Sequence, residues 1–313
     1  MSEVAKEYPL VSIVCATYNQ ERYIAQCLDG LLMQKTDFQY EVIVNDDAST
    51  DSTPDIIREY ESRYNKLIGI YQELNLWSQG YSILRTVLCP RVRGKYVAIC
   101  EGDDYWIDPY KLQKQVDYME AHPEVSVCAT EGYIYNQVSG KMFSLSTLGP
   151  GEYSPEQFLR ENQIFTLSTL IRSDWLMEYQ FKLVPVMPRF LMGDYPMWMF
   201  MLKRGKIVKL PDKCVVYREL EESASHTKND FKYMDFVISS RDIQVYFNRL
   251  MKFDVRLVNY RRYRHVRRVC RRRARMGNHG FWTLYIYSLY RMLFHSKTRP
   301  ARKAQEVVRE ILK

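Results

Sequence analysis

Apolar residues in the first 130 positions fall into two alternating kinds of run. Continuous apolar runs such as "LVSIVCATY" (10–18) are typical of strands that are buried on both faces, as in a parallel sheet. The runs between them, such as "ERYIAQCLDGLLMQ" (21–34), repeat apolar residues at helical spacing. The pattern predicts strands over 10–18, 40–47, 67–72, 95–104 and 124–130, and helices over 21–34, 52–64, 80–92 and 109–122.

This alternation predicts an α/β fold with an open, mostly parallel, Rossmann-like sheet, because right-handed crossovers place helices on both faces. Ligands of such sheets bind beyond the carboxyl ends of the strands. Three of the predicted strands end in polar pairs, namely Tyr18 with Asn19, Asp46 with Asp47, and Asp103 with Asp104. Polar side chains therefore gather where this architecture places a binding site.

The pattern is less regular after residue 130. It predicts a hairpin or mobile loop over 135–155, and it mixes strand and helix signals over 163–176. Further along, it predicts a turn and then a helix from near Pro196, paired short strands over 206–220, and helices from 231 onward. We expect a main domain over 1–230, with a nucleotide-binding half (8–130) and an acceptor half (131–230). Residues 231–313 would form a helical, basic C-terminal extension.

The composition is that of a globular protein with an uneven charge. Apolar residues make up 46% of the 313 residues, which excludes a disordered chain. The formal net charge is +8, and nine arginines lie between positions 261 and 275. Such a cluster indicates an anionic partner, either lipid headgroups or nucleic acid.

Cysteine usage and hydropathy indicate the compartment. Seven scattered cysteines without a CxxC pair are typical of reduced thiols in the cytosol. The N-terminal "MSEVAKEYPL" has no apolar signal region, and no apolar run reaches the roughly 18 to 20 residues that span a bilayer. We expect a cytoplasmic protein, either soluble or peripheral at the inner face of the cell membrane.

The carboxylates in "VAICEGDDYW" (97–106) are the first candidate site. Two like charges about 4 Å apart cost roughly 1 kcal/mol in water and about 4 kcal/mol at an effective dielectric of 20. Asp103 and Asp104 beside the phosphates of a nucleotide would therefore need a divalent cation, and Mg²⁺ or Mn²⁺ prefers such oxygen ligands. The alternative is that both residues cap the following turn.

The stretch "VIVNDDASTDSTPDII" is the second candidate element. Asp46 or Asp47 could accept hydrogen bonds from a base or ribose. Ser49 and Asp51 are better explained as caps of the next helix. That helix is predicted to take Thr53 as its N-cap and the following proline as its first helical residue.

Three motifs, "PLVSIVCATYNQERYI", "YEVIVNDDASTDSTPDI" and "GKYVAICEGDDYW", occur in this order. Together they resemble the family 2 glycosyltransferases, which have the GT-A fold, over roughly residues 8 to 225. The usual family motif is DxD or DDD, whereas this chain places Gly102 before its Asp pair. The resemblance implies a nucleotide-sugar donor, most often a UDP-sugar, a Mn²⁺ or Mg²⁺ ion, and inversion at the anomeric carbon.

The resemblance also implies roles for individual residues. Asp47 would contact the base, and Asp103 would approach the ribose. Asp104 would bind the metal that bridges the diphosphate. Ala16 and Tyr18, at the end of the first strand, would flank the base, with stacking by Tyr18 as one possibility.

The stretch "FLMGDYPMWMF" matches the family's late aspartate, which serves as general base and here is Asp194. An acceptor hydroxyl becomes a good nucleophile only as its proton is taken. Flanking apolar residues would desolvate this carboxylate and tune its pKa. The alternative is a helix N-cap, since Pro196 follows closely.

Three later residues are weaker candidates. Arg218 could reach the diphosphate, and related bacterial sequences show a similar Tyr-Arg followed by a His. His226 could add a metal or phosphate contact, although a single His is more often structural. Arg172 could face the acceptor or pair with Asp174.

The stretch "FWTLYIYSLYRMLFHS" (281–296) follows the arginine cluster and is aromatic nearly all round. It resembles an interfacial segment on anionic lipid. The alternative is a helix packed on the protein with its arginines in solvent. No motif supports binding to nucleic acid.

These features favour an inverting, metal-dependent glycosyltransferase that acts on a glycan or a lipid-linked sugar in polysaccharide or glycolipid synthesis. A sugar nucleotidyltransferase needs a Gly-rich loop after the first strand, where this chain has "ATYNQERY". A Rossmann dehydrogenase or P-loop enzyme would need a GxGxxG or GxxxxGK[ST] motif, which the chain lacks. The non-enzyme alternative is a nucleotide-sugar-binding or membrane-associated scaffold protein.

Overall fold

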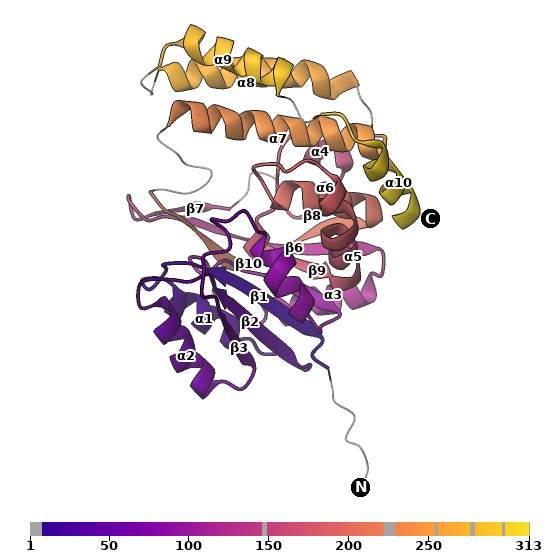
Figure 1. The fold of residues 1–313 in the computed structure, drawn as a ribbon. Coiled ribbons are helices and arrows are strands. Elements are labelled where there is room, and N and C mark those ends of the chain that lie inside the picture. Colours follow the sequence, from indigo (N-terminus) through magenta and orange to yellow (C-terminus); the bar gives the residue numbers. More distant parts are fainter. Residues whose placement is uncertain are drawn as a thin grey trace. The chain divides into compact units, whose positions relative to one another are not determined.

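The computed structural model describes residues 8–145, 149–221, 229–253, 256–275, 279–295 and 298–312, with the backbone alone over 256–263. The chain divides into two compact units (Figure 1). Unit 1 comprises residues 1–153, 163–177 and 205–219, and unit 2 comprises 154–162, 178–204 and 220–313. The domain boundary predicted near residue 230 stays a prediction.

Unit 1 is built on one mixed sheet whose first half is parallel. The strands there lie in the order β3-β2-β1-β4. Val11 lies opposite both Tyr40 and Tyr96, so the central strand is aligned with both neighbours. These strands are β1 (Val11–Thr17), β2 (Tyr40–Asp46), β3 (Leu67–Tyr71) and β4 (Tyr96–Ile99). The predicted strands and the parallel sheet are confirmed here, but the strand predicted over 95–104 ends at Ile99.

The second half of the sheet is mixed. It continues from β4 in the order β9-β6-β10-β5, with β6 and β10 parallel and the other pairs antiparallel. The strands are β5 (Tyr105–Trp106), β6 (Val125–Asn136), β9 (Leu170–Arg172) and β10 (Lys206–Glu219), with β7 (Lys141–Ser144) beside β6 and β8 (Gly151–Tyr153) beside β10. The prediction of paired short strands over 206–220 was wrong. Residues 206–219 form one strand, because register shifts between Leu210 and Val215 absorb the Pro-Asp interruption.

The helices of unit 1 follow the predicted order with local differences. They are α1 (Ile24–Leu32), α2 (Thr53–Arg63), α3 (Lys111–Ala121), the 3-10 turn η3 (Thr166–Ser168) and the start of α5 (Ser173–Glu178). The helix predicted over 80–92 is a π turn, η1 (Leu84–Leu88), followed by a 3-10 turn, η2 (Cys89–Arg91). Ser52 rather than Thr53 is the N-cap residue of α2, and the Thr53 hydroxyl accepts the Gln20 N–H at 2.8 Å.

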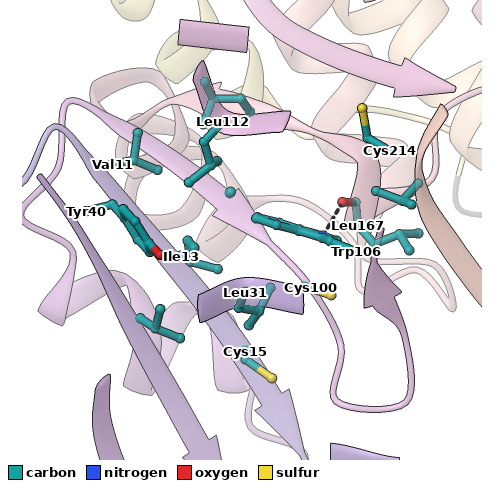
Figure 2. Close-up of a cluster of buried hydrophobic side chains, with 14 of the residues drawn as sticks. Val11, Ile13, Cys15, Leu31, Tyr40, Cys100, Trp106, Leu112, Leu167 and Cys214 are labelled. Carbon is teal, nitrogen blue, oxygen red and sulfur yellow. Dashed lines mark hydrogen bonds between the residues drawn. The ribbon is translucent and has the colours of Figure 1, made fainter. Parts of the chain in front are cut away.

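Trp106 lies at the centre of the core of unit 1 (Figure 2). Its side chain is 2% exposed, and its indole N–H donates to the Leu167 carbonyl at 3.0 Å. The Nζ atom of the buried Lys111 lies 3.8 Å from the centre of the indole ring and donates to Gln115 Oε1 at 2.8 Å. Burial lowers the pKa of Lys111 to about 8. A single indole therefore joins β5, the segment before β9 and helix α3.

Unit 2 is helical in its described residues. Its elements are α4 (Pro155–Phe158), the turns η4 (Tyr179–Leu183) and η5 (Val184–Val186), α6 (Asp194–Arg204), α7 (Asp230–Met251), α8 (Arg256–Ala274), α9 (Phe281–Phe294) and α10 (Arg302–Ile311). Helix α6 begins at Asp194, two residues before the predicted start. Among the described residues, no helix has both the length and the apolar content needed to cross a membrane.

The core position of Trp106 gives a stability prediction. Trp106→Ala should lower the free energy of unfolding by about 3 to 5 kcal/mol, because it leaves a cavity and an unpaired Leu167 carbonyl. Trp77→Ala is the matched control, since the Trp77 side chain in the same unit is 66% exposed. That control should change the free energy by about 0.5 kcal/mol or less. Equal effects of the two substitutions in urea titrations would contradict this account of the core.

Candidate active site

The carboxyl ends of β1, β2 and β4 meet at one edge of the sheet of unit 1. Ala16 lies opposite Asn45 on β2, and its carbonyl accepts the Gly102 N–H at 3.1 Å. A Cβ atom at position 102 would lie 2.8 Å from the Cβ of Thr17, closer than side chains approach. The glycine that departs from the usual family motif therefore lets the turn after β4 lie against β1. Tyr18, one residue beyond β1, is 46% exposed.

The turns after β1 and β2 are joined by reciprocal hydrogen bonds. The Asn19 N–H donates to Ser49 Oγ at 2.8 Å, and the Thr50 N–H donates to Asn19 Oδ1 at 2.8 Å. Asp51 accepts the Thr53 N–H at 3.0 Å, so this residue has the predicted role of a cap at the start of α2. Asn19 has φ = 51°, a left-handed conformation that asparagine tolerates better than most residues. This network fixes the backbone on which Tyr18 and Asp47 stand.

Asp47 follows β2 and is 3% exposed. Its N–H donates to the Thr17 carbonyl at 3.0 Å. Its two carboxylate oxygens accept the N–H groups of Leu76 and Trp77, at 2.9 and 3.0 Å. Asp47 therefore holds the 76–77 segment beside the strand ends. The sequence pattern did not reveal this role, because the two partners lie 29 and 30 positions further along the chain.

The acidic turn after β4 buries its charge. Asp104 is 2% exposed, and its pKa is raised well above the ordinary value by burial and by the charges of Asp103 and Glu101. Burial also raises the pKa of Asp103, against the opposing effects of Arg218 and Gln20. Asp104 Oδ1 accepts the backbone N–H of Arg218 at 2.7 Å. Among the described residues, none donates a hydrogen bond to Asp104 Oδ2.

Arg218 reaches this turn from β10, where the pairing of Val216 with Tyr105 sets its position. Arg218 is 7% exposed, and its guanidinium donates to the Asp103 carbonyl at 2.7 Å. It also donates to Gln26 Oε1 at 2.7 Å and to Gln137 Oε1 at 3.1 Å. It stacks near the rings of Tyr23 and Tyr105, at 4.7 and 5.0 Å from the ring centres.

Within the described part of the chain, the hydrogen-bond acceptors of the guanidinium are uncharged, so its positive charge acts on the two aspartates through space. The structure thus brings together Arg218, Asp103 and Asp104, three of the residues that the sequence singled out. Gln26 and Gln137 were not predicted, because nothing in their local sequence marks them.

The residues of the turn fit a divalent cation only in part. Within the described part of the chain, no group of three or more His, Cys, Asp or Glu residues could hold a metal ion. Mg²⁺ and Mn²⁺ need only one or two carboxylates when phosphate and water oxygens complete the shell. Asp104 Oδ2 is an available hard ligand of this kind. His226, the other predicted metal contact, lies outside the described residues.

Asp194 is the first residue of α6 in unit 2. Asn162 Nδ2 donates to Asp194 Oδ2 at 2.7 Å, and the following residues, Tyr195 to Met201, are buried. Burial raises the pKa of Asp194, although the hydrogen bonds from Asn162 and from the Tyr195 N–H oppose the shift. The raised pKa agrees with the expected desolvation, and the position at the helix start agrees with the alternative of an N-cap. Asn162 was not predicted, because it lies 32 residues away in sequence.

Among the described residues, Arg172 does not pair with Asp174, and its role toward an acceptor stays a prediction. Its Nε donates to the Val125 carbonyl at 2.8 Å and its Nη2 to the Met119 carbonyl at 3.3 Å. It therefore caps the carboxyl end of α3, where carbonyl groups lack helical partners. Asp174, its other expected partner, accepts the neighbouring Trp175 N–H instead.

The sequence model described as glycosyl transferase family 2 matches residues 12–183. An uncharacterized protein of Mycobacterium tuberculosis is 38% identical over 219 residues, which cover 69% of this chain and 61% of that protein. TuaG of Bacillus subtilis, whose name assigns it to glycosyl transfer in teichuronic acid biosynthesis, is 29% identical over 70% of this chain and 83% of its own length. The chain thus matches less than two thirds of the length of the mycobacterial relative.

Two solved structures share the fold. Staphylococcus aureus TarS 1–349 in complex with UDP-GlcNAc has a TM-score of 0.57 at 19% identity, covering 96% of this chain and 91% of that one. The mannosyltransferase PcManGT from Pyrobaculum calidifontis, in complex with GDP-Man and Mn²⁺, has a TM-score of 0.54 at 17% identity. The match covers 97% of this chain and 87% of that one. Both similarities confirm the predicted GT-A fold.

The buried charge of Asp104 leads to a prediction about the stability of the protein. Asp104→Asn keeps an acceptor for the Arg218 N–H but removes the repelled carboxylate. A carboxyl group whose pKa is raised in the folded state binds more protons there than in the unfolded chain, so its charge destabilises the fold at pH 7. The substitution should therefore raise the free energy of unfolding of the ligand-free protein at pH 7.

This gain in the free energy of unfolding should shrink as the pH falls towards the ordinary pKa range of carboxyl groups. There the Asp104 side chain of the wild type is protonated, and it is then as uncharged as the asparagine of the variant. Asp55→Asn is the matched control, since the Asp55 side chain is 80% exposed and pairs with Arg58 at the surface. That control should change stability by about 1 kcal/mol or less. Urea titrations at pH 7 and pH 5 measure both variants. A loss of stability in Asp104→Asn at pH 7 would show that the charge is compensated in the folded state.

Proposed function

Because this chain belongs to glycosyl transferase family 2, we propose that it transfers a sugar from a nucleotide-sugar donor, a UDP-sugar, to an acceptor hydroxyl with inversion. The observation that carries the proposal is the repelling carboxylate pair after β4, the buried Asp104 and the half-buried Asp103, with Arg218 against it. Such an arrangement has a raised free energy without a ligand and is typical of functional sites.

The donor would occupy the edge of the sheet in unit 1. Asp47 would accept a hydrogen bond from the base with the lone pairs that the Leu76 and Trp77 amides leave free. The exposed ring of Tyr18 and the backbone at Ala16 would flank the base, and Asp103 would approach the ribose. The UDP-GlcNAc complex of TarS, which shares the fold, supports UDP as the nucleotide. GDP-Man in PcManGT marks the other donor to test.

Asp104 would hold a divalent cation through Oδ2, with Asp103 beside it. A bound Mn²⁺ or Mg²⁺ would neutralise the two carboxylates and stabilise the negative charge of the departing diphosphate. The Mn²⁺ that accompanies GDP-Man in the PcManGT complex supports a metal of this kind. Arg218 would add a fixed positive charge beside the diphosphate, held in place by its hydrogen bonds to Gln26 and Gln137.

Asp194 would act as the general base. Its raised pKa brings the carboxylate closer to the basicity that removes a proton from a hydroxyl near neutral pH. The Asn162 amide would hold Oδ2, and with it the carboxylate, in place for the transfer of the proton. A hydroxyl deprotonated in this way attacks the anomeric carbon opposite the nucleotide, which gives inversion.

The acceptor is proposed to be a glycan or a lipid-linked sugar of a surface polysaccharide. The name of TuaG, which refers to teichuronic acid biosynthesis, supports this class. A non-catalytic scaffold is the second candidate, and the raised pKa of Asp194 argues against it because a scaffold gains nothing from a desolvated base.

Substitution of the proposed base tests the enzyme proposal. Asp194→Asn should lower kcat by about 100- to 10,000-fold, the usual contribution of a general base, and should leave the affinity for UDP within about twofold. Asp174→Asn is the matched control, because Asp174 also lies in the first turn of a helix but is exposed. Sugar transfer from radiolabelled UDP-sugars provides the readout. Full activity of Asp194→Asn would exclude Asp194 as the base.

The hydrogen bond from Asn162 gives a pH prediction. This bond lowers the pKa of Asp194, so Asn162→Ala should raise that pKa. A base must be deprotonated to act, and the acid limb of the plot of log kcat/KM against pH should therefore move to higher pH. Activity on the alkaline plateau should change less than activity on the acid limb. An acid limb at the same pH in both proteins would contradict this role of Asn162.

A further inference from the structure

Helix α8 presents a row of arginines to solvent. Its exposed side chains with described positions, extended by the residue just after the helix, are all arginines, namely Arg264, Arg267, Arg268, Arg271, Arg272 and Arg275. The sequence contains no Asp or Glu between Asp254 and Glu306. The positive charge of this row is therefore not offset by any carboxylate from α8 or α9.

Helix α9 presents an uncharged, mainly apolar ridge. Its exposed large side chains are Trp282, Ile286, Tyr290, Leu293 and Phe294, with exposed fractions between 52% and 73%. Trp282, Ile286, Tyr290 and Phe294 recur every four residues, and Leu293 lies three residues after Tyr290. This spacing places all five on one face of the helix. The opposite face, with Leu284 and Met292, is buried. An exposed ridge of this kind is rare on soluble proteins unless it binds something.

The two exposed faces belong to one three-helix core. Val266 and Cys270 of α8 pack with the buried face of α9 against Met234 and its neighbours on α7. Each of the three helices contacts the other two, and α8 and α9 run across the same side of α7 (Figure 1). The guanidinium of Arg271 lies 5.8 Å from the centre of the Phe281 ring, at the junction of the two helices. The arginine row and the apolar ridge therefore lie on two helices that pack against each other.

The six arginines of the α8 row and the five residues of the α9 ridge are together called the α8–α9 face. We propose that the α8–α9 face binds an anionic lipid membrane. The arginines would contact phosphate headgroups, and the ridge would enter the boundary between headgroups and acyl chains. An open surface hollow of about 250 Å³ lies between the side chains of Arg264, Arg267, Arg268 and Arg271.

Charge and hydropathy together select this partner. A second copy of the chain in a symmetric contact would bring one arginine row against another, which repel. Nucleic acid would neutralise the arginines but leave Ile286 and Leu293 in water. A lipid surface satisfies both kinds of side chain. Helix α9, with 14 residues, is too short to cross a bilayer and would lie in its surface. This inference goes beyond the proposed sugar transfer and does not depend on it.

Sedimentation with vesicles tests the α8–α9 face. The full chain should bind vesicles that contain phosphatidylglycerol much more tightly than vesicles of phosphatidylcholine alone, which offer only the apolar contact. The triple variant Arg267→Gln, Arg268→Gln, Arg271→Gln should bind on the order of 100-fold more weakly, about fivefold per basic residue. The control, Lys35→Gln with Lys141→Gln and Lys182→Gln, removes the same charge from exposed sites elsewhere and should bind within about threefold of wild type.

A second variant tests the apolar ridge. Trp282→Ser with Ile286→Ser and Leu293→Ser should abolish the part of vesicle binding that persists in high salt, since salt screens only the arginines. Circular dichroism and UDP titration of every variant separate these losses from misfolding and from failure of the donor site. Absence of vesicle binding by the wild type would overturn the proposal. The proposal would also be overturned if both triple variants bound vesicles as tightly as the wild type while the arginine substitutions weakened binding to a nucleic-acid oligomer.

Discussion

Repulsion between buried carboxylates after β4 is the constraint on which the site depends. Asp104 is almost completely buried beside Asp103 and Glu101, and burial and repulsion together raise its pKa. Arg218 is the group that holds this turn: its backbone N–H donates to Asp104, and its side chain donates to the Asp103 carbonyl. The contact links β10 to a turn that lies far earlier in the chain, so the sheet must be complete before the turn is stable.

The rest of the donor site is fixed by backbone hydrogen bonds rather than by charge pairs. Asp47 uses both oxygens on the amides of Leu76 and Trp77, and Asn19 exchanges hydrogen bonds with the turn after β2. Rigid turns of this kind position exposed groups such as Tyr18 at little entropic cost on binding. The carboxylates after β4 are left as the strained element, and a cation bound there would relieve the strain.

Much of this fold and part of the site could be predicted from the sequence. Strands of continuous apolar residues, such as β1 and β2, and the acidic turn after β4 are local signals. The roles of Gln26, Gln137 and Asn162 were not predictable, because their partners are distant in sequence and the residues carry no local pattern. The expected pairing of Arg172 with Asp174 was wrong for the same reason, since the partners of Arg172 are backbone carbonyls that no sequence motif marks.

The central claim is that Asp104 and a divalent cation together bind the diphosphate of a nucleotide donor. Calorimetric titration of UDP into the wild type and Asp104→Asn, each with and without Mn²⁺, tests it most directly. UDP should bind the wild type tightly only with Mn²⁺. The Mn²⁺-dependent part of the UDP affinity should be lost in Asp104→Asn. Equal UDP affinity in all four titrations, or no binding of UDP or GDP in any of them, would contradict it.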